Sequence, residues 1–166
     1  MIRISILAVC LAAALPTASA RTDNTAALAV LEAVYANRPI GSWRFAATTF
    51  NCETALLNPL FESLLSFGLE GNESETTNNS MLQPAQRTPV SGTWQLTGAP
   101  RATLTTEAFI LFSSDSGPMK QGSQTIRQDI RLTSKHSLAD TATIIYRNSG
   151  GHVILTGCAT AVGQWL

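Results

Sequence analysis

The sequence contains little charge and no concentration of one sign. Only 13% of its 166 residues are charged, with 11 basic and 11 acidic side chains and a formal net charge of +0 at pH 7. A protein that binds nucleic acid neutralises phosphates with clustered lysine and arginine, and the chain has no such basic run. The composition therefore predicts no nucleic-acid partner.

Long apolar runs are missing beyond the N-terminus. A membrane-spanning helix needs about 20 consecutive apolar residues, and no segment after residue 20 reaches that length. We therefore expect no membrane span in the mature chain.

Residues that build reactive centres are also scarce. The two histidines, His136 and His152, lie on different predicted turns and cannot form a three-histidine zinc site. The chain has no Gly-x-Ser-x-Gly motif, no Walker loop and no Gly-x-Gly-x-x-Gly. The sequence predicts no catalytic residue, no metal site and no cofactor, and it weighs against an enzyme without excluding one.

Segment 1–20, MIRISILAVCLAAALPTASA, has the pattern of a secretory signal peptide. Arg3 supplies a positive start, an apolar stretch follows, and Ala18-Ser19-Ala20 is the small-x-small pattern that precedes cleavage. A membrane anchor, the alternative, would need a longer apolar run. We expect cleavage after Ala20 and export to the periplasm or the extracellular medium.

Cysteine is rare, and its positions predict one bridge. Cys10 lies in the predicted signal peptide, which leaves Cys52 and Cys158 in the mature chain. Because thiols oxidise in exported proteins, a Cys52–Cys158 disulfide is predicted. Two buried free thiols are the alternative.

β-Branched and apolar residues, interrupted by turn residues, are abundant. A helical pattern within segment 21–40 ends at Pro39, and strand-like segments then follow over 41–166. The eight predicted strands are 43–52, 61–69, 73–77, 93–97, 102–112, 123–133, 138–147 and 152–162.

These strands are joined mostly by hairpin-length connections with no helix between them, which predicts an all-β antiparallel meander. Eight such strands form a sandwich or close into an up-and-down barrel. The cysteines favour the eight-stranded barrel, because a bridge between the first and last strands forms readily when the meander closes on itself. A sandwich is the alternative.

Two Gly-x-Trp motifs open predicted strands: Gly41-Ser42-Trp43 opens the first and Gly92-Thr93-Trp94 the fourth. The first resembles the strand-one motif of lipocalins and other calycin barrels, in which the tryptophan packs across the closed end. The segments GSWRF, FESLLSF, QRTPVSGTW, FILF and TGCATAVG resemble a group of uncharacterised exported bacterial proteins. This resemblance covers nearly the whole mature chain and implies a calycin-like barrel without implying any chemistry.

Side-chain alternation predicts which residues face the interior of the barrel. On this basis Leu69, Val153 and Leu155 belong to apolar faces, and both cysteines point outward. The expected core consists of Trp43, Phe45, Phe67, Trp94 and Ile130.

Two amides fall on an apolar face. Gln124 and Gln128 are in step with Ile126 on one predicted strand, and buried amides need partners. They either bond within a filled core or orient a ligand, in which case the further candidate ligand-binding residues are Tyr146, Thr106 and Trp43.

A possible pair of carboxylates consists of Glu107, in the fifth predicted strand, and Asp140, in the seventh. We expect Glu107 to point outward. Reversed strand parity would instead make it a buried acid with a raised pKa.

Three functions fit this pattern. The first is binding of a small, largely apolar molecule in the barrel lumen. The second is a cyclase or isomerase of the allene-oxide-cyclase-like barrel kind, in which a shaped lumen acts with few polar groups. The third is a protein–protein module such as an inhibitor, with the long connection 78–92 as its contact surface or as a lid.

Overall fold

The computed structural model describes residue 35 and residues 37–79, 86–114 and 117–166. The predicted signal peptide and most of the predicted N-terminal helix lie outside these residues. The described part of the chain is all-β. Its nine strands are β1 (Gly41–Phe50), β2 (Phe61–Phe67), β3 (Asn72–Thr77), β4 (Gln86–Arg87), β5 (Val90–Gly98), β6 (Arg101–Ser114), β7 (Gly117–Ser134), β8 (Ser137–Asn148) and β9 (Val153–Trp165).

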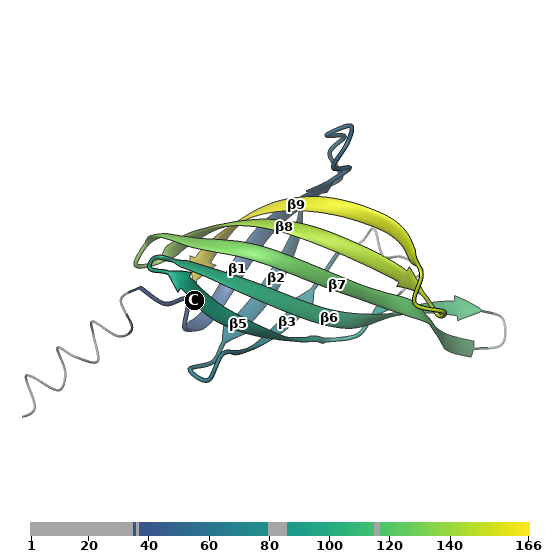
Figure 1. Cartoon of the computed structure of the whole chain (residues 1–166), viewed down its shortest axis with the longest axis horizontal. Coiled ribbons are helices and arrows are strands. Elements are labelled where there is room, and N and C mark those ends of the chain that lie inside the picture. Colours follow the sequence, from purple (N-terminus) through teal and green to yellow (C-terminus); the bar gives the residue numbers. More distant parts are fainter. Residues whose placement is uncertain (1–34, 36, 80–85, 115–116) are drawn as a thin grey trace, which may run out of the picture.

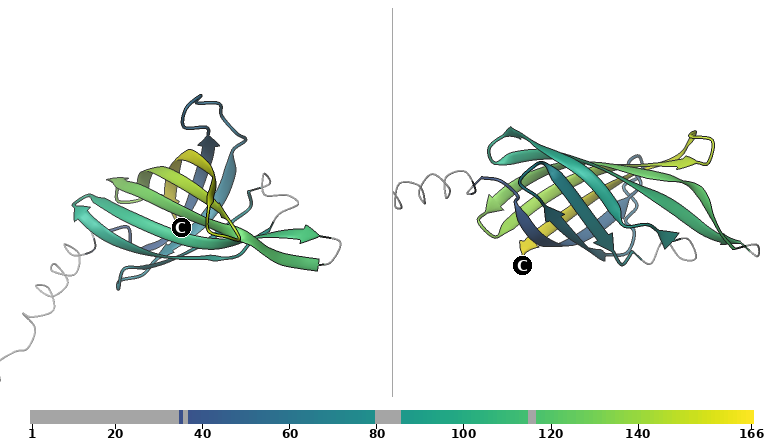
Figure 2. Two further views of the ribbon diagram at one scale, coloured as in Figure 1. Left: turned by 45° about the vertical axis from the view of Figure 1, so that its right-hand side comes forward. Right: turned by 90° about the horizontal axis from the view of Figure 1, so that it is seen from below.

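All strands except β4 close into one antiparallel barrel (Figure 1). The order around the barrel is β1, β2, β3, β5, β6, β7, β8 and β9, and β9 pairs back with β1. That closing register runs from Trp43 opposite Trp165 to Phe50 opposite Cys158. Figure 2 shows the strands wrapping around a common axis. The predicted eight-stranded meander barrel is confirmed, and the sandwich alternative is wrong.

β4 is a short strand that the sequence did not predict. It pairs with β6 through Gln86 opposite Leu111 and Arg87 opposite Ile110, beyond the point where β5 pairs with the same strand. Pro89 separates β4 from β5, because proline has no N–H to donate to a strand ladder. Across this break, β4 pairs with the part of β6 that lies beyond β5, and Arg87 belongs to β4.

An apolar core fills the end of the barrel where β1, β6 and β8 begin. Both Gly-x-Trp tryptophans belong to it: Trp43 is 2% exposed and Trp94 is 7% exposed. The Trp43 indole N–H donates to the Pro39 carbonyl at 2.7 Å, and that of Trp94 donates to the Gly68 carbonyl at 3.0 Å. Both rings are therefore buried with their donors satisfied. The core contains Trp43, Phe45, Ala47, Leu65, Phe67, Trp94, Ala102, Leu104, Ile130, Leu138 and Ala161, including all five residues predicted for it.

The predicted disulfide is present. Cys52 follows the end of β1 and is exposed, while Cys158 lies on β9 opposite Phe50. The two Cα atoms are 5.1 Å apart and 106 positions apart in the sequence, within the usual Cα range of roughly 4.4–6.8 Å. The bridge thus joins the first and last strands of the barrel at their shared seam.

Three apolar residues expected on inward faces are exposed instead. Leu69 is 55% exposed, because β2 ends before it at Phe67 and it lies in the following turn. Val153 and Leu155 are 57% and 56% exposed. They precede Cys158, so in this part of β9 the chain pairs with β8 alone and no residue of β1 lies alongside.

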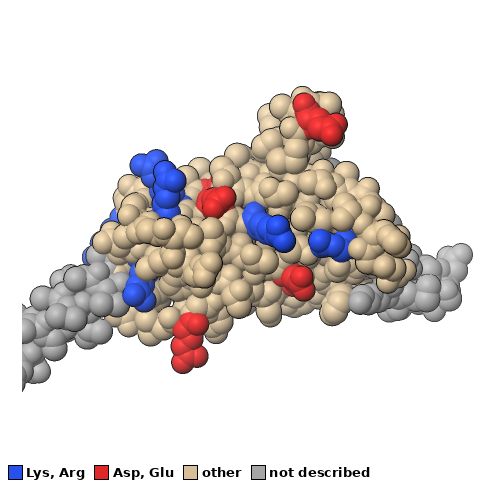
Figure 3. Space-filling view, viewed as in Figure 1, with Lys and Arg blue, Asp and Glu red and all other residues tan. Residues whose placement is uncertain are grey.

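The polar side chains that alternate with core residues along the strands lie on the outer face of the barrel. Arg127, Asp129 and Arg131 of β7 are exposed. Glu107 of β6 is exposed as well, which confirms its expected outward direction. Positive and negative side chains are scattered singly over the face seen in Figure 3.

Candidate functional site in the barrel lumen

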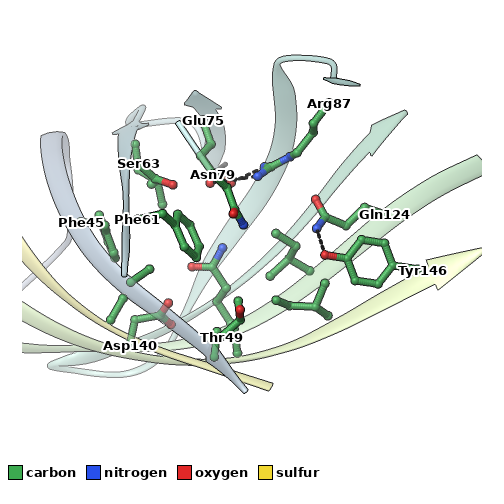
Figure 4. Close-up of a pocket in the computed structure, with 18 residues that line it drawn as sticks. Phe45, Thr49, Phe61, Ser63, Glu75, Asn79, Arg87, Gln124, Asp140 and Tyr146 are labelled. Atoms are coloured by element: carbon green, nitrogen blue, oxygen red, sulfur yellow. Dashed lines mark hydrogen bonds and ion pairs between the residues drawn. The ribbon is translucent and has the colours of Figure 1, made fainter. Parts of the chain in front are cut away.

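Beside the apolar core the lumen contains a cavity of about 50 Å³ (Figure 4). That volume admits a few water molecules or a small functional group. The cavity wall is partly apolar, with Phe45, Phe61, Leu65, Ile126 and Ile144. Its polar side chains come from six strands and include Thr49, Ser63, Glu75, Arg87, Gln124, Gln128, Asp140 and Tyr146.

A buried ion pair lies at one side of the cavity. Arg87 Nη2 is 2.6 Å from Glu75 Oε2, and Arg87 Nη1 donates to Glu75 Oε1 at 3.3 Å. The two side chains are 5% and 6% exposed. This two-point contact occupies both terminal nitrogens of the guanidinium and both oxygens of the carboxylate.

Asp140 is a buried carboxyl group on the wall of the cavity. It lies on β8 between Ile130 of β7 and Ala161 of β9, and it is 7% exposed. Its Oδ1 atom has no hydrogen-bond partner within the described part of the chain. Burial raises the pKa of Asp140 to about 8, with further contributions from the charges of Glu75 and Asp129; a backbone hydrogen bond from Thr141 opposes the rise.

Two amides and a phenol form the other polar wall. The Gln124 Nε2 group donates to the Tyr146 hydroxyl at 2.9 Å, whereas Gln124 Oε1 finds no partner among the described residues. Burial raises the pKa of Tyr146, so its hydroxyl stays protonated. Gln128 lies two positions beyond Ile126 on the same inward face and is 7% exposed.

A third carboxyl is buried beside the cavity rather than on its wall. Glu73 of β3 is 4% exposed and lies next to Gly92 of β5, which in turn pairs with Thr106 of β6. A Cβ at Gly92 would lie 3.1 Å from Glu73 Oε2 and 2.5 Å from Thr106 Cγ2, so glycine leaves the room that these side chains fill. Burial, and then the charge of Glu75, raises the pKa of Glu73 to about 8, although Arg87 opposes the rise.

Buried carboxyl groups outnumber buried cationic groups in the described part of the lumen. Among the described residues the lumen contains three carboxyls, Glu73, Glu75 and Asp140, and one guanidinium, Arg87. Since Arg87 is already bonded to Glu75, the other two carboxyls face the low-dielectric interior without a paired cation.

Three of the five predicted ligand-binding residues line the cavity, and two do not. Gln124, Gln128 and Tyr146 line the cavity. Trp43 belongs to the apolar core that fills one end of the barrel, here called the closed end, and Thr106 is fully buried near Glu73. Neither residue lines the cavity.

The ion pair and the two unpaired carboxyls were not predicted as parts of the site. The sequence indicates Asp140 only as a possible member of a carboxylate pair, although it is in step with Leu138, Ile144 and Tyr146. Strand β3 reads NESETT, in which Glu73 and Glu75 share one face. This two-residue spacing could have predicted that the two glutamates face the same side of the sheet. No sequence pattern predicted the position of Arg87, because its segment has the composition of a loop.

No group of three or more histidine, cysteine, aspartate or glutamate side chains within the described ranges is arranged to hold a metal ion. Over the same residues no helix is long and apolar enough to cross a membrane. No protein-family model, no curated protein and no solved structure matches this chain.

Proposed function

We propose that this barrel binds a small ligand in its lumen, with the ligand's polar group on the cavity's polar wall and its apolar part against the aromatic and aliphatic wall. One observation carries the proposal. Four buried polar atoms on residues of a single cavity lack partners in the described structure: Asp140 Oδ1, Gln124 Oε1, Ser63 Oγ and Arg87 Nε. Buried polar atoms are nearly always hydrogen-bonded, and each unsatisfied one costs about 1–3 kcal/mol.

The architecture supports the same reading. An eight-stranded barrel has room for side chains or for one small ligand. Here the apolar core closes one end, while the space beside it is lined by polar groups, some of which have no partner among the described residues. Export is part of the proposal: the N-terminal signal pattern supports it, and the Cys52–Cys158 disulfide is compatible with an oxidising location.

A second candidate is proton transfer in a cyclase or isomerase reaction. The observation that favours it is the pKa of Asp140, raised to about 8 by burial. A carboxyl that titrates near neutral pH is suited to general acid–base work. The third function considered, protein–protein interaction through the 78–92 connection, gains no support from the described residues.

The binding proposal can be tested on the exported protein by native mass spectrometry. We expect an adduct of a small molecule that is released on denaturation. A mass that repeatedly equals that of the bare chain, together with no thermal shift from a library of small amphiphilic compounds, would contradict the proposal.

The substitution Gln128→Leu separates a ligand contact from a core contact. If Gln128 orients a ligand, ligand retention falls while the ligand-free protein unfolds at nearly the wild-type denaturant concentration. If it only satisfies core partners, stability falls by about 1–3 kcal/mol and ligand retention per folded molecule is unchanged. Gln95→Leu, at an exposed position of β5, is the matched control.

A further inference from the structure

Among the residues that the structure describes, the lumen contains three buried carboxyl groups and one guanidinium. Arg87 uses both terminal nitrogens on Glu75. Asp140 lines the same cavity, is 7% exposed, and has an oxygen without a partner in the described part of the chain. We propose that the cavity takes the protonated amino group of a small, largely apolar amine, with Asp140 as its counter-ion. This inference rests on the proposed function, since it requires the lumen to bind a ligand.

Charge complementarity selects a cation over an anion. An anionic group in the cavity would meet the negative charge of Glu75 and of ionised Asp140 at low dielectric, where like charges repel strongly. The one guanidinium available there already binds a carboxylate. A neutral hydroxyl could form a hydrogen bond with Asp140 but would not stabilise its ionised form as a cation does.

The other cavity residues suit an alkylammonium. The unpartnered oxygens Ser63 Oγ and Gln124 Oε1 are further acceptors on the same wall, and an ammonium group only donates. The side chains of Phe45, Phe61 and Ile144 offer apolar surface for a carbon chain. A cavity of about 50 Å³ fits an amino group and its first carbons, rather than a bulky ring system.

The inference has a pH signature. The titratable groups that share the cavity with Asp140 or act on it are Glu75, Arg87 and Tyr146 inside the barrel and Asp129 outside. Without ligand, burial holds the pKa of Asp140 near 8, so an ammonium must displace its proton at neutral pH. Affinity for the ammonium should therefore rise about tenfold per pH unit up to about pH 8 and then level off. A neutral ligand would show no such rise.

The probes are hexylammonium and 1-hexanol, which share a slim six-carbon chain and differ in the head group. Each is titrated into the ligand-free mature protein at pH 6, 7 and 8.5, and binding is followed by nuclear magnetic resonance of the backbone and glutamine amides. We expect hexylammonium to bind at least tenfold more tightly than hexanol at pH 8.5 and to weaken about tenfold per unit below pH 8.

The matched variants are Asp140→Asn, which removes the charge with little change in shape, and Glu107→Gln, which removes an exposed charge outside the barrel. Asp140→Asn should abolish the preference for the amine, and Glu107→Gln should keep it. Should Asp140→Asn fail to fold, the wild-type pH series decides the question alone.

Two results overturn the inference in different ways. If hexanol binds in the cavity as tightly as hexylammonium, or if both variants lose the preference alike, the ammonium inference fails and the ligand-binding proposal stands. If neither probe binds and native mass spectrometry finds only the bare chain, both fail together.

Discussion

The two halves of the barrel interior treat buried polar atoms in opposite ways. At the closed end, Trp43 and Trp94 bring two indole N–H groups into an apolar core, and each donates to a nearby backbone carbonyl. In the adjoining half, Asp140 and Gln124 each keep a buried oxygen that no described residue satisfies. The protein itself therefore satisfies the two indoles, whereas these lumen oxygens have no partner among the described residues, which is the basis of the ligand-binding proposal.

The difference shows where the stability of the molecule comes from. Burying one large apolar side chain contributes about 1.5–3 kcal/mol, and the closed end buries many of them. Each unsatisfied polar atom in the lumen costs about 1–3 kcal/mol. The apolar core and the disulfide at the β1–β9 seam thus offset the cost of the unsatisfied polar atoms in the lumen.

The largest expected effect on stability comes from a substitution in the apolar core at the closed end. Trp43→Ala removes a ring that is 2% exposed and leaves a cavity, so the free energy of unfolding should fall by about 4–5 kcal/mol. Denaturant unfolding measures the loss. Leu56→Ala, at a side chain that is 73% exposed, serves as the control and should change stability by less than about 0.5 kcal/mol. A Trp43→Ala protein within about 1 kcal/mol of the wild type would show that the closed end is not the stabilising half.

A smaller effect is expected from breaking the ion pair in the lumen. Glu75→Leu leaves the Arg87 guanidinium buried without a counter-ion, and the free energy of unfolding should fall by about 3 kcal/mol. The double variant Glu75→Leu with Arg87→Met removes both charges and should recover most of that loss. A double variant as unstable as Glu75→Leu alone would mean that the pair acts through shape rather than through charge.

The last prediction concerns the pH dependence of stability, whose effect is the smallest for a change of a single pH unit. Burial raises the pKa of Asp140 from its ordinary 3.8 to about 8, so between these pH values the folded protein holds a proton that the unfolded chain has released. Stability is therefore highest at acid pH and falls as pH rises, by about 1.4 kcal/mol per unit for one such group. Asp140→Asn lacks this contribution, while Glu73 retains its own.

Unfolding curves recorded from pH 5 to 8 should therefore fall less steeply for Asp140→Asn than for the wild type. Glu107→Gln, whose carboxyl is exposed, should follow the wild type. Identical slopes in all three proteins would show that Asp140 is solvated in the folded state and would remove the contrast between the two halves.

Local alternation was enough to predict much of this molecule. The two-residue period placed Trp43 and Phe45 in the core, and the same period placed Gln124 and Gln128 inside the barrel, where both are buried. It could not orient β3, because NESETT is polar on both faces and only pairing with Leu65 and Phe67 of β2 decides which face turns inward.

By itself the sequence determined the all-β meander, the pairing of Cys52 with Cys158 and the apolar core, because each follows from composition or from spacing along one strand. Only the tertiary structure decided the charge balance of the lumen. Arg87 reaches Glu75 because a break at Pro89 lets β4 pair with β6, whereas Asp140, on β8, keeps an oxygen without a partner among the described residues. A sequence shows which side chains share a face; whether a buried charge has a partner depends on strands that meet only when the barrel closes.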